Sequence, residues 1–467
     1  MKIIYMMADT FRRDHMGAYG NKWIHTPNLD KLAAQSALFE NAYIGSFPTV
    51  PNRRDTLLGK GDKAAPFNGW RPLDRDEVTF LQYLTEKNIP SQLVTDTQNN
   101  VTGSVGKMAM NLFRDYAAWI LNRGQEGDTY WLDANVPLVF PVPHRLIRYR
   151  AEMWHQVLIN RAHRQVETDW FAPGTYSIAM RWLERNYKRD DFFLWIDTFD
   201  PHEPWDPPQH YIDLYDPGYK GRIFDAPTYG LRRKMGITDK EMTHIRACYA
   251  GEATMVDTWV GRLLETVERL GIADETMIIF TSDHGTMMDT PGDNGLICKP
   301  NTIGADGMCM SAGLPMKEPK QFFPIFENVA RIPLLIRMPG MRKGKRVKTI
   351  VQPWDVSATI LDAFGIKKPK QFIGSSLLPH VRGKGKTIRD AAICGSGPLA
   401  QAINSQWIYT VWQGQRAPSL IDLKADPQAK RNAIGKNPAV AKQLHNQVVA
   451  FMRRQGIAEE FIAKYVC

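Results

Sequence analysis

The chain has 467 residues, of which 43% are hydrophobic and 23% are charged, and its formal net charge is +10. This composition is typical of a soluble globular protein of about two or three domains. No apolar run reaches the roughly 18 residues of a membrane span, and the five cysteines are scattered without a C-x-x-C pair, which argues against a disulfide framework or a structural zinc site.

The sequence also limits the partners and the location that we expect. The positive charge is not accompanied by a basic helix or an aromatic–basic motif, so a nucleic-acid partner is not predicted. Residues 1–7 are strand-like and lack the basic region and cleavage site of a signal peptide. We therefore expect a cytoplasmic protein without a membrane partner.

Predicted strands and helices alternate through most of the chain. Residues 1–8 form a buried strand that ends at Asp9, and a helix begins at Pro27 with Thr26 as its N-cap. Further strands are predicted at 38–43, 91–95, 192–196, 277–281, 332–336 and 350–351, and further helices at 79–86, 177–189, 238–270 and 356–364. Residues 100–170 are expected to be irregular, and residues 286–324 to be a loop.

The pattern changes after about residue 385, where short strands are predicted at 391–393 and 407–412, followed by a closing helix at about 437–454. The expected organisation is a catalytic domain over residues 1–384. A small C-terminal subdomain of short antiparallel strands and one helix follows over residues 385–467.

The segment Thr-Val-Pro-Asn-Arg at residues 49–53 is predicted to start a helix that carries chemistry, and Gly59 is a suitable C-cap. The helix N-terminus would favour negative charge beside Thr49. Arg53, four residues on, lies on the same face and adds a cation. A hydroxyl so placed can act as a nucleophile on an anionic ester. An ordinary threonine cap has the same local pattern, so the other site residues decide between the two interpretations.

Polar residues follow three predicted strands: Asp9, the turn at residues 197–202, and the adjacent Asp283 and His284. The carboxyl ends of parallel strands are where α/β enzymes place their chemistry. Asp9, Asp283 and His284, with the Thr49 oxygen as a fourth ligand, predict a site for one divalent metal ion. Three oxygens and one imidazole suit Mn²⁺, Zn²⁺ or Fe²⁺ better than Ca²⁺ or Mg²⁺.

In their order and spacing these motifs resemble those of sulfatases of the alkaline phosphatase superfamily, along nearly the whole chain. The matching segments are residues 8–10, 26–30, 49–53, 200–205, 281–285, 331–340 and 420–427. The resemblance implies an alkaline-phosphatase-like α/β sandwich, with a large mixed, mostly parallel sheet flanked by helices and a small α+β subdomain at the C-terminus. It also implies hydrolysis of an anionic ester of a small molecule or oligosaccharide, with His202 protonating the leaving group. A homo-oligomer is compatible with the resemblance.

Three departures from the family pattern bear on the substrate. Thr49 stands where the family has a Cys or Ser that is oxidised to formylglycine, whose hydrate attacks sulfur and later expels sulfate by elimination. Thr49 cannot be converted in this way, so formylglycine is not expected and water has to hydrolyse the Thr49 ester. Thr10 replaces a second Asp usual in sulfatases, and His284 replaces a common Asn. Both changes make the site resemble that of the phosphonate monoester and phosphodiester hydrolases of the superfamily.

The third departure lies after the third strand, where the family's Gly-Lys-Trp-His is replaced by Thr95 and the three substrate-binding candidates Asp96, Thr97 and Gln98. The family also places an active-site lysine after the second metal motif. Lys299 matches the upstream context of that lysine, whereas Lys320 matches its spacing to Phe326-Glu327, and both stay candidates.

The sequence therefore predicts a metal-dependent hydrolase in which Thr49 attacks, Arg53 and a lysine contact the free oxygens of the substrate, and His202 is the acid. A phosphate monoester, phosphate diester or phosphonate ester is the first expectation, because the formylglycine precursor is missing. A sulfuric ester is the alternative, because the scaffold resembles that of sulfatases. Two further alternatives are a second metal ion bound by Asp197 or Asp200 with His202, and a non-catalytic relative that only binds anions.

Overall fold

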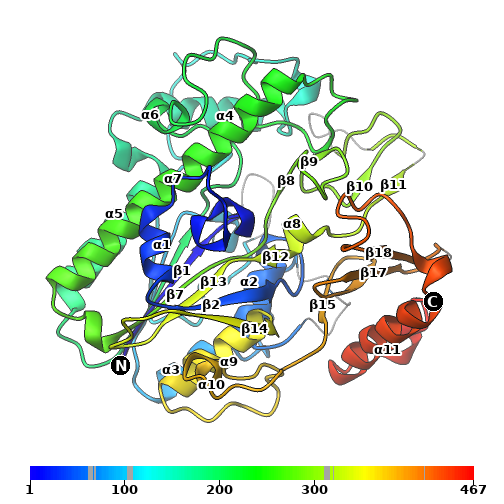
Figure 1. Ribbon diagram of the computed structural model, residues 1–467. Coiled ribbons are helices and arrows are strands. Elements are labelled where there is room, and N and C mark those ends of the chain that lie inside the picture. The colour runs from blue at the N-terminus through cyan, green and yellow to red at the C-terminus, as the bar shows by residue number, and fades with distance from the viewer. Residues whose placement is uncertain (62–66, 68–69, 102–108, 310–315, 319, 415) are drawn as a thin grey trace.

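The computed structural model describes residues 1–61, 67, 70–101, 109–309, 316–318, 320–414 and 416–467 (Figure 1). Its core is a nine-stranded sheet in the order β12-β2-β13-β7-β1-β5-β3-β4, with β14 paired to β2. The strands are β1 (Lys2–Ala8), β2 (Ala37–Tyr43), β3 (Ser91–Thr95), β4 (Ala118–Leu121), β5 (Phe192–Thr198), β7 (Thr276–Ser282), β12 (Arg331–Ile332), β13 (Leu334–Arg337) and β14 (Lys345–Val351). Strands β7, β1, β5, β3 and β4 run parallel, whereas β13 is antiparallel to both of its neighbours. The predicted mixed, mostly parallel sheet is confirmed.

Strand β1 lies in the middle of this sheet, and all seven of its residues are buried. Ile3 and Tyr5 belong to the hydrophobic cluster on one face of the sheet, whereas Ile4 and Met6 belong to the cluster on the other face. This division follows from the alternation of side chains along a strand. A strand that is covered on both faces is apolar throughout, which explains why the run shows no polar alternation.

Helices cover both faces of the sheet, as Figure 1 shows. One hydrophobic cluster includes residues of α1 (Pro27–Ala33), α5 (Phe171–Asn186) and α7 (Asp239–Arg269), and the other includes residues of α2 (Thr49–Leu58), α3 (Phe80–Glu86) and α9 (Pro353–Ala363). Helix α7 is 31 residues long and begins with a capping box formed by Thr238 and Glu241. Among the described residues, none of the helices is long and apolar enough to cross a membrane.

Two regions that were expected to be irregular contain regular structure. Residues 100–170 include β4 and the 12-residue helix α4 (Ala151–Ala162), whose buried Trp154 and Val157 are three residues apart, as on one face of a helix. The loop expected at 286–324 contains the short strands β8 (Met287–Met288), β9 (Leu296–Cys298), β10 (Thr302–Ile303) and β11 (Gln321–Phe322). Strands of two or three residues are too short to show a period. The remaining short elements are β6 (Gly230–Leu231), α6 (Gln209–Ile212), α8 (Glu327–Ala330), α10 (Leu378–Val381) and α12 (Glu459–Ile462).

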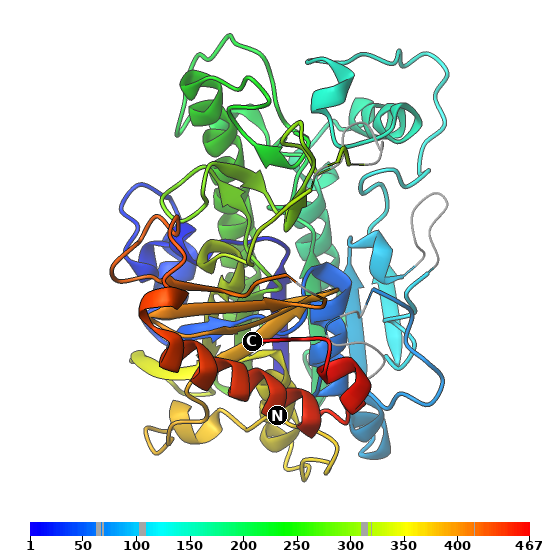
Figure 2. The same cartoon turned by 90° about the vertical axis from the view of Figure 1, so that its right-hand side faces the viewer.

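The C-terminal part forms a second, antiparallel sheet in the order β15-β16-β17-β18. These strands are β15 (Ala392–Ser396), β16 (Leu399–Ile403), β17 (Trp407–Trp412) and β18 (Ser419–Asp422), and helix α11 (Pro438–Arg454) lies across them (Figure 2). The backbone N–H of Phe47 donates to Gly395 O at 2.8 Å, so this sheet adjoins the segment that leads to Thr49. The expected division after residue 384 stays a prediction.

Candidate active site

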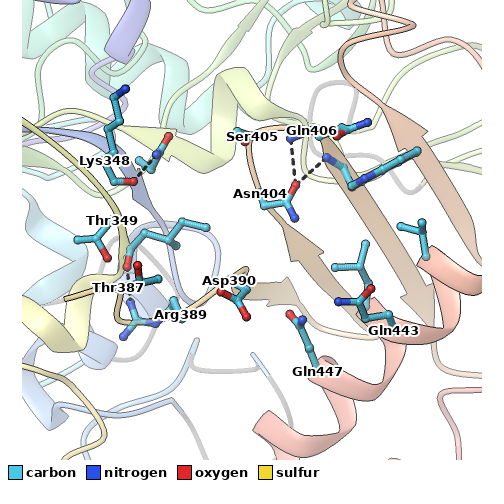
Figure 3. Close-up of a pocket in the computed structure, with 15 residues that line it drawn as sticks. Lys348, Thr349, Thr387, Arg389, Asp390, Asn404, Ser405, Gln406, Gln443 and Gln447 are labelled. Carbon is cyan, nitrogen blue, oxygen red and sulfur yellow. Dashed lines mark hydrogen bonds between the residues drawn. The ribbon is translucent and has the colours of Figure 1, made fainter.

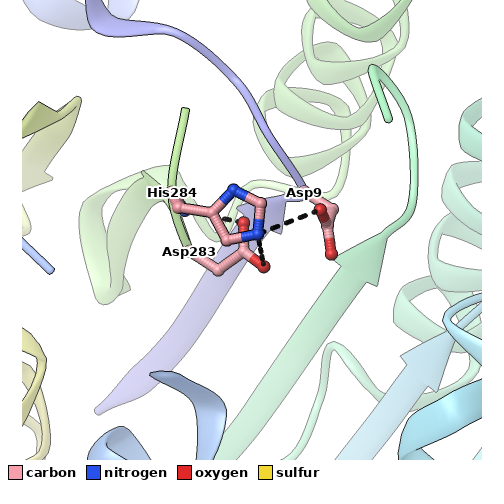
Figure 4. A group of neighbouring side chains, drawn as sticks. All are labelled: Asp9, Asp283 and His284. Atoms are coloured by element: carbon pink, nitrogen blue, oxygen red, sulfur yellow. Dashed lines mark hydrogen bonds and ion pairs between the residues drawn. The ribbon is translucent and has the colours of Figure 1, made fainter. Parts of the chain in front are cut away.

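Asp9, Asp283 and His284 meet at the carboxyl ends of two neighbouring strands. Strands β1 and β7 pair in parallel with Ala8 opposite Ser282, so the residues that follow them lie side by side. One ligand atom from each of the three side chains lies within 4.8 Å of the others, and all three side chains are buried (Figure 4). The structure therefore brings together the three side chains that were expected to bind a metal.

The ring of His284 presents a lone pair to the two carboxylates. Its Nδ1 donates to the carbonyl oxygen of Gly285 at 2.9 Å, so Nε2 is left as the acceptor, 3.6 Å from Asp283 Oδ2 and 3.9 Å from Asp9 Oδ1. Burial lowers the pKa of His284 to about 4, although the nearby Asp283 opposes this shift. A neutral imidazole with a carbonyl behind it is the usual form of a histidine that ligates a metal.

Thr49 is the first residue of α2 and lies beside this group. Its Oγ1 is 3.4 Å from His284 Nε2, and the side chain is 5% exposed. Helix α2 is buried along its whole length and is followed by Gly59 as its C-cap, with a φ of 63°, as expected. The hydroxyl thus lies at a helix N-terminus, where negative charge is stabilised, next to the three metal-ligand candidates.

Arg53 is enclosed by three buried aspartates, with which it forms the carboxylate cluster (Arg53, Asp9, Asp197 and Asp283). Its guanidinium donates to both Asp197 oxygens at 2.8 and 2.6 Å and to Asp283 Oδ2 at 2.6 Å, and it lies 3.3 Å from Asp9 Oδ2. The role of Arg53 as a contact of substrate oxygens stays a prediction. Three buried carboxylates need a counter-charge, and the guanidinium supplies it.

The carboxylate cluster has three acids and one base, which leaves it short of positive charge. Burial and the neighbouring Asp283 raise the pKa of Asp9 well above its usual value. Burial would also raise the pKa of Asp283, but His284 and Arg53 hold it below its usual range. Both oxygens of Asp9 are buried, and neither accepts a hydrogen bond from a described residue. This donor set fits a divalent metal ion.

A second charged group, the ammonium cluster (Arg148, Glu203, Tyr229 and Lys299), lies beside His202. Arg148 and the Tyr229 hydroxyl both bond to Glu203 Oε1, and Lys299 Nζ is 3.9 Å from Glu203 Oε2. Burial alone would raise the pKa of Glu203, but Lys299 and Arg148 hold it below its usual value. The Lys299 ammonium is buried and donates no hydrogen bond to a described residue, so its charge is available to an anion.

His202 is buried next to the ammonium cluster. Its Nδ1 donates to the backbone oxygen of Glu203 at 2.6 Å, and Nδ1 is also 3.5 Å from Glu203 Oε2. Burial, together with Lys299 and Arg148, holds the pKa of His202 well below its usual value. The remaining ring nitrogen, Nε2, is the atom that can exchange a proton with a leaving group.

The two lysine candidates differ in their surroundings. Lys299 is 9% exposed and is one of the charges that lower the pKa of both His284 and His202. Lys320 is more exposed and pairs with Glu318 at 2.9 Å. Lys299 thus lies beside both histidines of the site, and its role as the active-site lysine stays a prediction.

The three substrate-binding candidates after β3 are buried, but two of them are engaged within the protein. Asp96 accepts hydrogen bonds from the Thr175 hydroxyl and the Phe199 N–H, and Gln98 Nε2 donates to Asp128 at 3.1 Å. The hydroxyl of Thr97 is buried without a hydrogen-bond partner among the described residues. The same loop reaches the carboxylate cluster through Asn100, whose Nδ2 lies 3.1 Å from Asp197 Oδ2. Their substrate-binding role stays a prediction.

The alternative with a second metal ion has little support from this geometry. Both oxygens of Asp197 are held by Arg53, and Asp200 accepts from the Ala172 N–H at 2.8 Å. Burial raises the pKa of Asp200 to about 7. Within the described residues, one group of three metal-ligating side chains is found, and it contains neither aspartate.

Sequence reasoning missed the residues that support the site. Glu203 follows His202 directly in the predicted turn. This position could have indicated Glu203, but no role was predicted for it from the sequence. Arg148 and Tyr229 come from stretches without a hydrophobic period, and nothing in the sequence indicated that they meet Glu203. Asp197 was considered only in the alternative with a second metal ion, whereas it is the bidentate partner of Arg53.

Comparison with known proteins agrees with this geometry. A family model described as Sulfatase matches residues 2–366. An arylsulfatase of Clostridium perfringens is 26% identical over 92% of this chain and 90% of its own, and an N-acetylglucosamine-6-O-sulfatase of Bacteroides thetaiotaomicron is 24% identical over 94% and 84%. The solved structure of a phosphonate monoester hydrolase of Agrobacterium radiobacter superposes with a TM-score of 0.71 at 18% identity, covering 97% of this chain and 96% of that one, which confirms the alkaline-phosphatase-like fold. The chain belongs to the sulfatase family and is a hydrolase acting on ester bonds.

Proposed function

We propose that the chain hydrolyses a sulfuric ester, with Thr49 as the nucleophile and one divalent ion held by Asp9, Asp283, His284 and the Thr49 oxygen. The observation that carries the proposal is the convergence of Asp9, Asp283 and His284 Nε2 beside Thr49 Oγ1. The curated relatives named above are sulfatases, so they support the sulfate alternative better than the phosphorus esters that we expected first. The donor set of three oxygens and one imidazole favours Mn²⁺, Zn²⁺ or Fe²⁺.

The residues of this chain divide the reaction between them. A divalent ion in this site would lower the pKa of the Thr49 hydroxyl and withdraw charge from the ester oxygens. Thr49 Oγ1 releases its proton to solvent and attacks sulfur, the bond from sulfur to the alcohol oxygen breaks, and protonated His202 gives that oxygen a proton from Nε2. Lys299 neutralises the anionic oxygens. Water then attacks sulfur and passes a proton to His202 Nε2, the bond to Thr49 breaks, and the Thr49 oxygen regains a proton from solvent as sulfate leaves.

A phosphate monoester, phosphate diester or phosphonate ester is the second candidate. Thr49 is the observation that favours it, because threonine cannot become formylglycine. Without formylglycine, the elimination step that releases sulfate in the family cannot take place. An ester of a threonine oxygen with phosphorus can be hydrolysed by water, so this chemistry needs no modified residue. Both candidates use the same metal ligands, the same acid and the same lysine.

The deciding experiment compares p-nitrophenyl sulfate, p-nitrophenyl phosphate, bis-p-nitrophenyl phosphate and p-nitrophenyl phenylphosphonate as substrates of the metal-reconstituted enzyme. We expect the sulfate to be hydrolysed most efficiently, Thr49→Ala to lower turnover by about 10³-fold or more, and the matched Thr49→Ser to keep much of it. Faster turnover of a phosphorus ester selects the second candidate. Equal turnover by wild type and Thr49→Ala would refute the role of Thr49 as the nucleophile. No turnover of any of the four substrates with metal bound would favour a non-catalytic relative that only binds anions.

A further inference from the structure

A cleft of about 540 Å³ separates the main sheet from the C-terminal sheet (Figure 3). One wall is formed by β14, by Asn41 of β2 and by residues 387–390, and the other by residues 404–407 and one face of α11. None of the site residues described above lines it. Its volume falls in the range of small-ligand sites, which is roughly 300 to 1,000 Å³.

The cleft is lined mainly by neutral polar side chains. Gln443 and Gln447 are four residues apart on α11 and therefore project from one face of the helix toward the cleft. Gln406 joins them from the turn between β16 and β17. Among the described residues, these three amide groups have no hydrogen-bond partner, so their donors and acceptors are available to a ligand.

The charges of the side chains that line the cleft nearly cancel. Arg389 is held by both oxygens of Asp355, at 2.5 and 2.8 Å, and is therefore not free to bind an anion. Lys348 and Asp390 are exposed and carry opposite charges. Asp390 and Gln447 project into the space between the two walls (Figure 3). The half-buried indole of Trp407 also lines the cleft and adds an apolar, flat surface.

We propose that this cleft binds one sugar residue of a saccharide chain, separately from the active site. A sugar ring has adjacent hydroxyls, which match the paired donor and acceptor of an amide, and a face of C–H groups, which matches an indole. An apolar ligand would leave the three amides without hydrogen bonds. A simple anion would be repelled by Asp390, and the guanidinium of Arg389 is already held by Asp355. The proposal does not depend on which ester the active site hydrolyses.

Binding of defined oligosaccharides to the full-length, metal-reconstituted protein tests the proposal. The probes are maltotetraose, cellotetraose, xylotetraose, chitotetraose and a chondroitin 4-sulfate tetrasaccharide, titrated by ligand-observed NMR up to about 10 mM. We expect at least one probe to bind. The double variant Gln443→Ala/Gln447→Ala should weaken its binding by about tenfold, because each lost hydrogen bond accounts for roughly two- to tenfold in affinity.

The matched control is Asn446→Ala, which removes an exposed amide from the same helix outside the cleft. It should change affinity by less than about twofold, as surface substitutions usually do. Absence of binding by all five probes overturns the proposal, and so does binding that the double variant leaves unchanged. Binding of the sulfated probe alone, abolished by salt, would instead indicate the surrounding basic surface, since residues 341–390 hold 12 Lys and Arg against three Asp and Glu.

Discussion

The two charged groups of the active site are built in opposite ways. The carboxylate cluster places three aspartates around Arg53, whereas the ammonium cluster places Arg148 and Lys299 around a single Glu203. The first therefore has an excess of negative charge, whereas in the second Arg148 is also paired with Glu126 at 2.8 Å and the buried Lys299 ammonium donates no hydrogen bond to a described residue. The difference shows how one site can hold a cation and an anionic ester at adjacent points: each group lacks the charge that its ligand supplies.

The largest effect is expected when the carboxylate cluster loses a metal ligand. Asp283→Asn should reduce the bound metal from one ion per chain to a small fraction and lower turnover by about 10³-fold or more. Elemental analysis beside an assay of p-nitrophenyl sulfate measures both effects. Asp257→Asn is the matched control, because Asp257 is a buried aspartate that accepts from the N–H groups of Asn28 and Leu29 away from the site. Full metal content in Asp283→Asn would contradict the assigned ligand set.

A smaller effect that leaves the metal in place is expected from the ammonium cluster. Lys299→Ala should keep one ion per chain, lower kcat/KM by roughly 10- to 100-fold and weaken inhibition by inorganic sulfate, because it removes a charge that faces the anion. Lys320→Ala should change each of these by less than about twofold, as surface charges usually do. Loss of metal from Lys299→Ala, or equal effects of the two substitutions, would show that the two clusters do not have separate tasks.

Substitution of Glu203 tests whether the ammonium cluster also needs its carboxylate. Glu203→Gln removes the carboxylate that Lys299 and Arg148 share, although Arg148 keeps Glu126, so His202 becomes harder to protonate and the acid step slows. We expect kcat/KM to fall by about tenfold, with the pH at which activity declines moving to lower values. A pH profile of kcat/KM separates this effect from simple loss of packing, which would lower activity equally at every pH.

The smallest effect concerns stability rather than turnover. The pKa of Asp200 is raised to about 7 by burial, so its stabilising contribution is complete below about pH 4 and is lost as the pH rises toward 7, because the unfolded chain releases the proton first. Asp200→Asn stays neutral and should raise Tm by about 2 °C at pH 8, with no gain near pH 4. Asp390→Asn, which changes an exposed carboxylate, should leave the pH dependence of Tm unaltered.

The part of the site that could be predicted is the part that follows from strand ends. Asp9, Asp283 and His284 come directly after strands whose apolar runs are evident, and the topology of a parallel sheet then brings them together. Thr49 was indicated by local helix-start chemistry. These inferences need only short segments and one rule of topology.

The supporting contacts could not be predicted because they join distant segments. Arg53 was expected one turn from Thr49, but its bidentate partner Asp197 is 144 positions away, and no local pattern connects them. Helix α4 was missed because its two most buried side chains, Trp154 and Val157, stand among charged and polar residues. The choice between Lys299 and Lys320 was left open, since both lie in a segment whose strands are too short to show a period.

The position of β1 has a consequence for biosynthesis. This strand leaves the ribosome well before its neighbours β5 and β7, which begin only at Phe192 and Thr276. At roughly 5 to 20 residues per second, this strand, which is apolar from Ile3 to Ala8, stays unpaired for about 10 s or more during translation. The nascent chain therefore carries an exposed, aggregation-prone segment until late in synthesis, and chaperones that shield such segments should increase the yield of folded enzyme.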